Sequence, residues 1–242
     1  MDPNKDAYGQ EIWAYYLGKP SFEIVERDDE YIDLSPGGKL YFAEYNDWPE
    51  FEKTAMKYVK GRVLDIGCGA GRHSLYLQEK GLDVLGLDNS PLAVKVCKER
   101  GLKNVKIMSI DEISQLKPNL FNTIIMMGNN FGLLGDFNKA KILLKKFHEI
   151  TSSQAIIIAS SNDPYKTDNP FHLEYQELNR KKGRMSGQIR IRLRFLKFIG
   201  DWFDYLLVSK KVMKEILNGT GWEVKEFIDS ENSFYIGIIE KI

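Results

Sequence analysis

The stretch from residue 62 to residue 160 alternates short apolar runs with helix-like patterns, and this alternation restricts the fold more than any other feature. The helical patterns carry clear end signals: Ser90 and Pro91 can open one helix, and Gly81 and Gly101 can close two. Alternating strands and helices are typical of a doubly wound α/β fold with a mostly parallel sheet. Five runs have strand character: Val63–Ile66, Asp83–Leu87, Val105–Met108, Phe121–Met127 and Ala155–Ala159.

The flanks of this region add further elements. Residues 1–46 are predicted to form an N-terminal arm with a helix over 6–17 and two short strands, Phe22–Glu26 and Tyr31–Leu34. Asp47 is predicted to cap a helix that opens the main domain, residues 47–242. At the other end, Trp222–Ile228 and Phe234–Glu240 are expected to form an antiparallel pair.

After the fifth strand the alternation breaks, and residues 161–208 are predicted to be an insertion. Residues 161–188 are polar and are expected to be mostly loop. From Ile189 to Phe195 aliphatic residues alternate with arginines, which is typical of a half-buried strand. Gly200 and Asp201 can then turn the chain, so Trp202–Val208 is expected to return as the second strand of a β-hairpin.

A glycine-rich loop, LDIGCGAGR at residues 64–72, lies between the first strand and its helix. Glycines there let the backbone turn tightly and approach a ligand, and the following helix N-terminus favours electron-rich groups. The spacing departs from the dinucleotide fingerprint G-x-G-x-x-G, because Arg72 stands where the last glycine belongs. Asp65 would also repel a pyrophosphate but not a cation. These two residues argue against a nicotinamide-dependent oxidoreductase.

The loop resembles the first motif of the class I S-adenosylmethionine-dependent methyltransferases, close to Asp-x-Gly-x-Gly-x-Gly. The resemblance covers roughly residues 60–160 and includes Asp88, the acid that ends the second strand. It implies a Rossmann-like, mostly parallel seven-stranded sheet with one antiparallel strand. It also implies an enzyme whose cofactor is S-adenosyl-L-methionine.

The same resemblance implies roles for individual residues. Asp88 would accept hydrogen bonds from both ribose hydroxyls, and Asp65 would help to hold the methionine ammonium group. Asp111, after the third strand, would contact the adenine amino group, and the amides around Gly67–Gly69 would face the amino-acid end. The predicted cofactor-binding residues are Asp65, Gly67, Cys68, Gly69, Gly71, Asp88, Asn89, Asp111 and Met127.

A sulfonium is a good leaving group, so an aligned acceptor needs a general base only if it arrives protonated. No catalytic residue is therefore assigned. Neither the two cysteines nor any other group has metal-ligand spacing, and no metal is expected. The candidate substrate residues come from the additions to the core and from the end of the fourth strand: Asn129, Asn130, His172, Trp13 and Arg192.

Charge is balanced overall, with 34 basic and 34 acidic side chains, which excludes a chain that is basic throughout. It is unevenly placed, however. Residues 1–60 are rich in acids, and residues 178–200 carry eight bases and no acid. The basic segment could meet an anionic partner or pair with the acidic arm.

The leading hypothesis is a methyltransferase that acts on a small molecule. One alternative is a methyltransferase that acts on RNA or protein through the basic segment, residues 180–197; nucleic acid is the less expected partner. Another is a non-catalytic module that binds S-adenosylmethionine. No signal peptide and no apolar run of 18 residues is recognised, so no membrane partner and a cytoplasmic location are expected. The acceptor, the methylated atom and the oligomeric state stay open.

Overall fold

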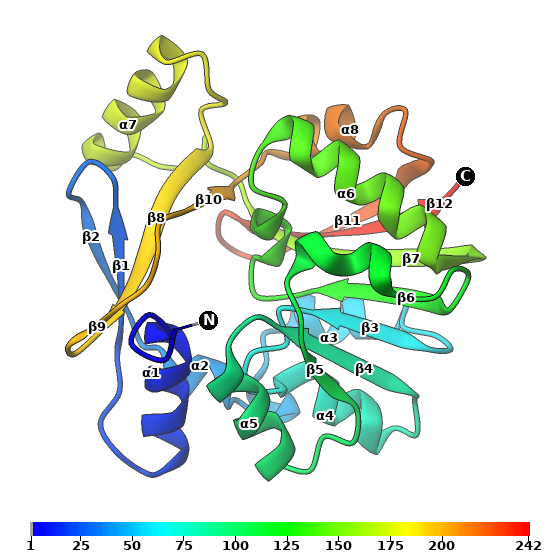
Figure 1. Ribbon diagram of the computed structural model, residues 1–242. Helices are drawn as coiled ribbons and strands as arrows, with labels where there is room; N and C mark the ends of the chain where they lie inside the picture. The colour runs from blue at the N-terminus through cyan, green and yellow to red at the C-terminus, as the bar shows by residue number, and fades with distance from the viewer. Residues whose placement is uncertain (1) are drawn as a thin grey trace. The chain divides into compact units, whose positions relative to one another are not determined.

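A computed structural model describes residues 2–242; Met1, the first residue of the predicted arm, lies outside the described residues. The larger of its two sheets has seven strands in the order β11-β12-β7-β6-β3-β4-β5 (Figure 1). These strands are β3 (Val63–Ile66), β4 (Val84–Asp88), β5 (Val105–Ile107), β6 (Phe121–Met126), β7 (Thr151–Asn162), β11 (Trp222–Asp229) and β12 (Phe234–Lys241).

Strand directions follow the sequence prediction. β4 and β5 are parallel, as are β6 and β7, whereas β12 runs antiparallel to both β7 and β11. The predicted doubly wound sheet with one reversed strand is therefore confirmed. β3 and β4 are buried along their whole length, which suits strands that are covered on both faces.

The chain divides into two compact units. The first comprises Met1–Trp48, Leu64–Ile110 and Arg190–Phe203. The second comprises Pro49–Val63, Asp111–Ile189 and Asp204–Ile242.

Two helices of the first unit begin at side chains that cap them. Asp6 caps α1 (Ala7–Tyr16) by accepting the Gly9 N–H, and Ser90 caps α5 (Pro91–Glu99) by accepting the Ala93 N–H. The Ser90 cap and Pro91 at the first helical position confirm the sequence prediction. The other helical segments of this unit are α2 (Gly38–Tyr41), η1 (Tyr45–Asp47) and α4 (Arg72–Glu79).

The second unit contains the longest described helix, α6 (Phe137–Ile150), whose first turn is capped by the Asp136 carboxylate. Trp222 is fully buried, and its indole N–H donates to the carbonyl of Leu144 in this helix at 2.9 Å. That bond fixes the start of β11 against α6. The unit's remaining helical segments are α3 (Glu50–Met56), η2 (Ile110–Gln115), η3 (Asn130–Leu134), α7 (Pro170–Lys181) and α8 (Lys210–Leu217). The first residue of η2, Ile110, still belongs to the first unit.

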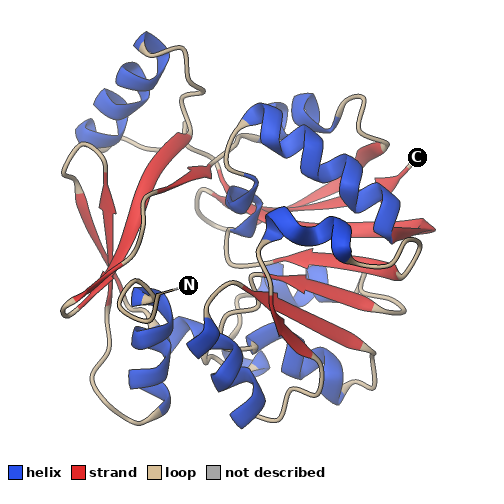
Figure 2. Ribbon diagram, in the orientation of Figure 1, coloured by secondary structure: helices blue, strands red, loops and turns tan. Residues whose placement is uncertain are grey.

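A smaller sheet has the strand order β10-β8-β1-β2, with β9 paired to β8 (Figure 1). Figure 2 draws the strands of both sheets in red. Its strands are β1 (Glu23–Arg27), β2 (Ile32–Ser35), β8 (Gln188–Phe195), β9 (Phe198–Ile199) and β10 (Phe203–Leu206). Within the first unit, Glu26 of β1 accepts hydrogen bonds from Arg192 at 2.7 Å and from Arg194 at 3.1 Å. The interpretation that the basic segment pairs with the acidic arm is thus confirmed for these two arginines.

Three local predictions were wrong. Residues 170–181 form helix α7 inside the stretch expected to be loop, with Asn169 as cap and Pro170 at the first helical position. Asp47 lies in η1, and Pro49, not Asp47, precedes α3. The chain turns first at Leu196, whose φ is +51°, so β9 pairs with β8 ahead of the predicted turn at Gly200. The predicted return strand is present, because β10 also pairs with β8.

No helix within residues 2–242 combines the length and the apolar character that crossing a membrane requires.

Candidate functional site

The glycine loop joins the carboxyl end of β3 to the N-terminus of α4. Gly67, Gly69 and Gly71 have φ values of +72°, +55° and +82°, a region of backbone conformation that other residues rarely adopt. The amides of Gly67 and Cys68 both donate to the carbonyl of Leu87 in β4, at 2.9 and 3.0 Å. The loop is therefore tied to the neighbouring strand, and its glycines are needed for their conformation.

Asp88 is the last residue of β4 and lies beside the glycine loop. Its carboxylate accepts the Gly69 N–H and the Ser90 N–H, both at 2.9 Å, so one side chain connects the glycine loop with the start of α5. Burial raises the pKa of Asp88 to about 6, and the two amide hydrogen bonds oppose that shift. A carboxylate at a strand end beside a glycine loop is suited to accept sugar hydroxyls.

Asp65 lies inside β3 and is 2% exposed. The Ser74 hydroxyl of α4 donates to it at 2.6 Å, and burial raises its pKa. His73 lies nearby and favours the charged carboxylate. The structure thus brings Asp65, the glycine loop and Asp88 together in one unit, while the cofactor role of Asp65 stays a prediction.

The other predicted residues of the loop region differ in exposure. Cys68 is buried, with its Sγ 3.9 Å from that of Cys97, and both cysteines are free. The Cys97 thiol and burial raise the pKa of the Cys68 thiol, which is unfavourable for a nucleophile. Asn89, between Asp88 and Ser90, is exposed.

Two residues of the N-terminal arm, which the sequence analysis did not single out, reach the start of α5 and the glycine loop. Asp6, 2% exposed, accepts the Ser90 hydroxyl at 2.9 Å in addition to capping α1. Tyr8 lies against Gly69 so closely that a methyl group on the Gly69 Cα would overlap the Tyr8 hydroxyl. The sequence predicts the helix but gives no signal for this contact, because residues 8 and 69 meet only through the tertiary fold.

Tyr8 belongs to a cluster of two tyrosines and two acids in the N-terminal arm. Its members are Tyr8, Glu11, Glu23 and Tyr41. The rings of Tyr8 and Tyr41 meet edge to face with centroids 5.2 Å apart, and the Tyr41 hydroxyl donates to Glu23 at 3.0 Å. Glu11 accepts the Gly38 N–H at 2.7 Å. Burial raises the pKa of Glu11, and it raises the pKa of Glu23 to about 7.

Glu23→Gln is expected to remove a pH-dependent part of the stability. Burial and the charges of Glu11 and Asp33 raise the pKa of Glu23 from 4.5 to about 7, and the Tyr41 hydrogen bond opposes them. The folded chain therefore keeps a proton that the unfolded chain loses, so the unfolding free energy falls as pH rises through this window. Urea unfolding should show a decline from pH 5 to pH 8 that is smaller in the variant, by at most roughly 3 kcal/mol.

The matched control is Glu30→Gln, which removes an exposed charge from the same arm. Its unfolding free energy should decline from pH 5 to pH 8 as much as that of the parent chain. Equal declines in the parent chain and in Glu23→Gln would contradict the assignment of this titration to Glu23.

Five predicted residues belong to the second unit. Asp111, in η2, forms an exposed ion pair with Lys139 at 2.8 Å, and Met127 is buried just after β6. The backbone N–H of Asn129 donates to Ser160 Oγ at 2.5 Å, and its carbonyl accepts the Tyr205 hydroxyl at 2.7 Å. Asn130 begins η3, and His172 lies in α7 with its Nδ1 3.4 Å from the Thr167 hydroxyl.

The two candidate substrate residues of the first unit are already engaged. The Trp13 ring carries the Lys95 ammonium 3.9 Å from its centroid, so it faces α5. The Arg192 guanidinium pairs with Glu26 and also stacks over Trp202 at 4.5 Å. Neither contact tests a role toward an acceptor. Within residues 2–242, no group of three or more His, Cys, Asp or Glu side chains is placed to hold a metal ion.

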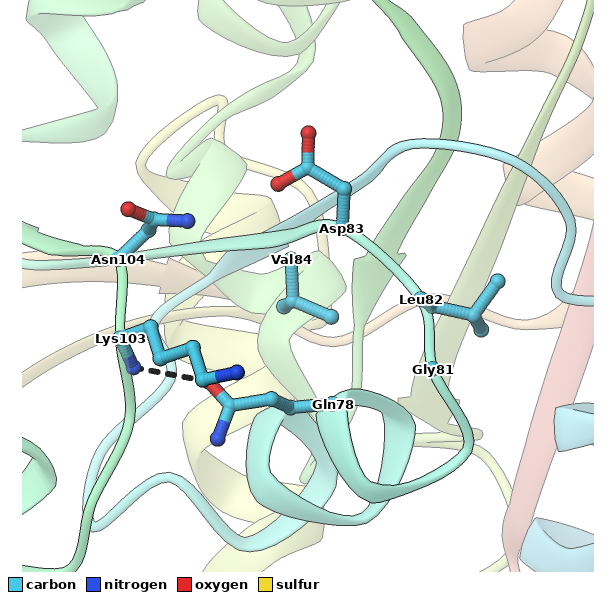
Figure 3. A pocket seen from close by; sticks show the side chains of 7 residues that line it. All are labelled: Gln78, Gly81, Leu82, Asp83, Val84, Lys103 and Asn104. Atoms are coloured by element: carbon cyan, nitrogen blue, oxygen red, sulfur yellow. Dashed lines mark hydrogen bonds between the residues drawn. The ribbon is translucent and has the colours of Figure 1, made fainter.

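A hollow of about 250 Å³ lies at the start of β4, the strand that ends at Asp88. Figure 3 shows the residues that line it. Its rim includes the hydrogen bond from the Lys103 N–H to Gln78 Oε1, at 2.8 Å. Ligands of open α/β sheets bind at the carboxyl ends of strands, so this hollow is distinct from the glycine-loop region. It is lined by Gln78, Gly81, Leu82, Asp83, Val84, Lys103 and Asn104.

Comparison with known proteins agrees with the geometry of the loop. The family described as "Methyltransferase domain" matches residues 63–153. A crystal structure of a SAM-dependent methyltransferase from Bacteroides fragilis, in complex with S-adenosyl-L-homocysteine, has a TM-score of 0.84 and 26% sequence identity. The alignment covers all of this chain and 97% of that one.

Two curated relatives share part of the chain. A 2-heptyl-1-hydroxyquinolin-4(1H)-one methyltransferase from Mycobacteroides abscessus is 49% identical over 109 residues, which is 43% of this chain and 40% of that protein. A ribosomal protein L11 methyltransferase from Thermosipho africanus is 30% identical over 155 residues, 58% of this chain and 56% of that protein. The chain thus spans about half the length of these relatives, and their acceptors differ in kind.

The residues present fit the cofactor of these proteins. The glycine loop, with its positive φ angles, and the buried carboxylate of Asp88 are joined by a hydrogen bond at the carboxyl ends of β3 and β4. The loop sequence, the strand order and the full-length structural likeness agree with one another. In motif, family match and fold, this chain is similar to the class I S-adenosylmethionine-dependent methyltransferases, a family of enzymes whose cofactor is S-adenosyl-L-methionine.

Proposed function

We propose that this protein transfers a methyl group from S-adenosylmethionine, in line, to a small-molecule acceptor. The observation that carries the proposal is the bond from the Gly69 amide to the Asp88 carboxylate, which holds the glycine loop against the acid of the second strand. The quinolone methyltransferase, 49% identical over its matched part, supports a small acceptor.

The proposed cofactor contacts are those implied by the family motif. The amides around Gly67–Gly69 would hold the amino-acid end, together with Asp65, and Asp88 would accept the ribose hydroxyls. Asp111 would contact the adenine amino group. Gly71, Cys68, Asn89 and Met127 complete the proposed set. When bound, the cofactor supplies a methyl group that its sulfonium already activates.

The chain's own contribution is then to align the acceptor and to exclude water, which supply much of the rate in such a displacement. No residue is assigned as a general base. The arm, residues 1–46, is proposed to cover the cofactor, and the insertion, residues 161–208, is proposed to supply acceptor contacts. Support comes from Tyr8 and Asp6, which reach the glycine loop and the start of α5.

Calorimetry with S-adenosylmethionine and S-adenosylhomocysteine tests cofactor binding. If neither ligand binds at millimolar concentration, the proposal is contradicted. Transfer of labelled methyl groups to a metabolite extract then tests the activity. Labelled small molecules support the proposal, whereas binding without transfer would indicate the non-catalytic module.

An RNA acceptor predicts binding with a steep salt dependence, because each neutralised phosphate releases counterions. In the first unit Arg192 and Arg194 already share Glu26, which reduces the charge available to a phosphate. We therefore expect RNA binding to be weak and unchanged when both arginines are replaced by alanine. Steep salt dependence that the double variant abolishes would favour RNA over a small molecule.

A further inference from the structure

The first turn of helix α1 presents Tyr8 to the glycine loop. The overlap that any side chain at Gly69 would make with the Tyr8 hydroxyl shows how close this approach is. Tyr8 also packs against a buried cluster that contains Ile12, Ala70 of the same loop and Ala93 of α5. Tyr8, which is half-buried, therefore lies against the loop.

Asp6 fixes this end of α1. Its carboxylate accepts the Gly9 N–H at 3.0 Å and the Ser90 hydroxyl at 2.9 Å, so it joins the first turns of α1 and α5. Ser90 itself follows Asp88 by two residues and donates its N–H to that carboxylate. Through these bonds the position of Tyr8 is coupled to that of Asp88.

Tyr41 and Glu23 restrain the Tyr8 ring from the other side. Tyr41 meets Tyr8 edge to face and is itself held by its hydrogen bond to Glu23. Burial raises the pKa of Tyr8 well above its usual value, and the nearby Tyr41 hydroxyl and the Asp88 charge act in the same direction. The phenol therefore stays protonated, and its oxygen is a neutral, electron-rich group beside the loop.

The covalent structure of the cofactor locates the atom that this oxygen faces. The sulfur joins the ribose to the amino-acid chain, and the proposed contacts place these two parts on Asp88 and on Gly67–Gly69. Tyr8 lies beside both. We propose that Tyr8 is a cofactor-binding residue next to the sulfonium and that it favours the charged cofactor over the neutral product; this inference rests on the proposed function.

The physical reason is the difference in charge between the two ligands. S-adenosylmethionine carries a positive sulfur, whereas the sulfur of S-adenosylhomocysteine is neutral. A phenol oxygen and an aromatic ring attract a cation. At partly desolvated sites this attraction typically raises the binding affinity by a factor of about 2 to 30. The contact would therefore strengthen binding of the cofactor and leave that of the product nearly unchanged, which assists product release.

The test measures dissociation constants by calorimetry for the full chain and three variants. Tyr8→Phe removes the oxygen, Tyr8→Leu removes the ring as well, and Tyr16→Phe is a control on the same helix, since Tyr16 is 37% exposed. The probes are S-adenosylmethionine, S-adenosylhomocysteine and sinefungin, in which a protonated amine replaces the methylated sulfonium.

We expect Tyr8→Phe to weaken the binding of the two cationic ligands about threefold and Tyr8→Leu to weaken it about tenfold. The dissociation constant of the neutral ligand should change less than about twofold. The control should match the parent chain. The inference would be overturned if neither Tyr8 variant altered the ratio of the dissociation constants of the charged and the neutral ligands. Equal weakening of the binding of all three ligands would overturn it too. Because the ratio is taken within each variant, partial unfolding does not imitate the effect.

The same experiment separates this inference from the function on which it rests. If the parent chain binds the ligands and the ratio does not move, Tyr8 lies elsewhere relative to the sulfur while the cofactor assignment stands. If the parent chain binds none of the three, the proposed function fails and the role of Tyr8 fails with it.

Discussion

Asp88→Ala is expected to weaken the binding of S-adenosylmethionine by roughly 100-fold or more. Two hydrogen bonds from ribose hydroxyls to a carboxylate would be lost, each worth about 1.5–3 kcal/mol. The variant also leaves the amides of Gly69 and Ser90 without their acceptor, which loosens the loop that holds the amino-acid end. Calorimetry gives the dissociation constant, and S-adenosylhomocysteine should be weakened equally, since it has the same ribose.

The control for this substitution is Asp83→Ala, which removes an exposed acid at the other end of the same strand. It should bind both ligands as the parent chain does. Asp88→Asn adds a second comparison, because it keeps the size of the side chain but not its charge. A dissociation constant for Asp88→Ala within threefold of the parent value would remove Asp88 from the cofactor site.

Gly69→Ala is expected to abolish cofactor binding at micromolar ligand concentration and to destabilise the first unit. The φ of +55° costs an L-residue about 1–2 kcal/mol, and the added methyl group overlaps the Tyr8 hydroxyl. Both the loop and α1 must move to relieve the overlap. Calorimetry should show the loss of binding, and thermal unfolding should show a lower Tm.

Gly81→Ala provides the matched control. Gly81 also has a positive φ, +84°, but a Cβ there meets no other atom within 4 Å. It should lower the Tm by a similar backbone contribution and leave cofactor binding intact. The pair therefore separates backbone strain from the contact with Tyr8. If both alanine variants bind normally, close approach of Tyr8 to the loop does not occur in solution.

Much of the fold was predictable because it depends on neighbours within a few residues. The caps Ser90, Asp136 and Ser209 form their hydrogen bonds with amides two or three residues ahead, and the sequence shows them directly. The glycine loop is equally local, since its spacing fixes the backbone conformation. Helix α7 was missed because its signals, Asn169 and Pro170, lie in a polar stretch with no clear apolar periodicity.

The sequence by itself determined the alternation of strands and helices, the glycine loop and the acid that ends β4. The tertiary structure alone decided that β1 of the arm pairs with β8, with Ile24 opposite Arg194, and that Tyr8 lies on Gly69. These partners are separated by 170 and by 61 positions in the printed sequence. Local propensity carries no information about such pairs, because they form only when the folded chain brings distant segments together.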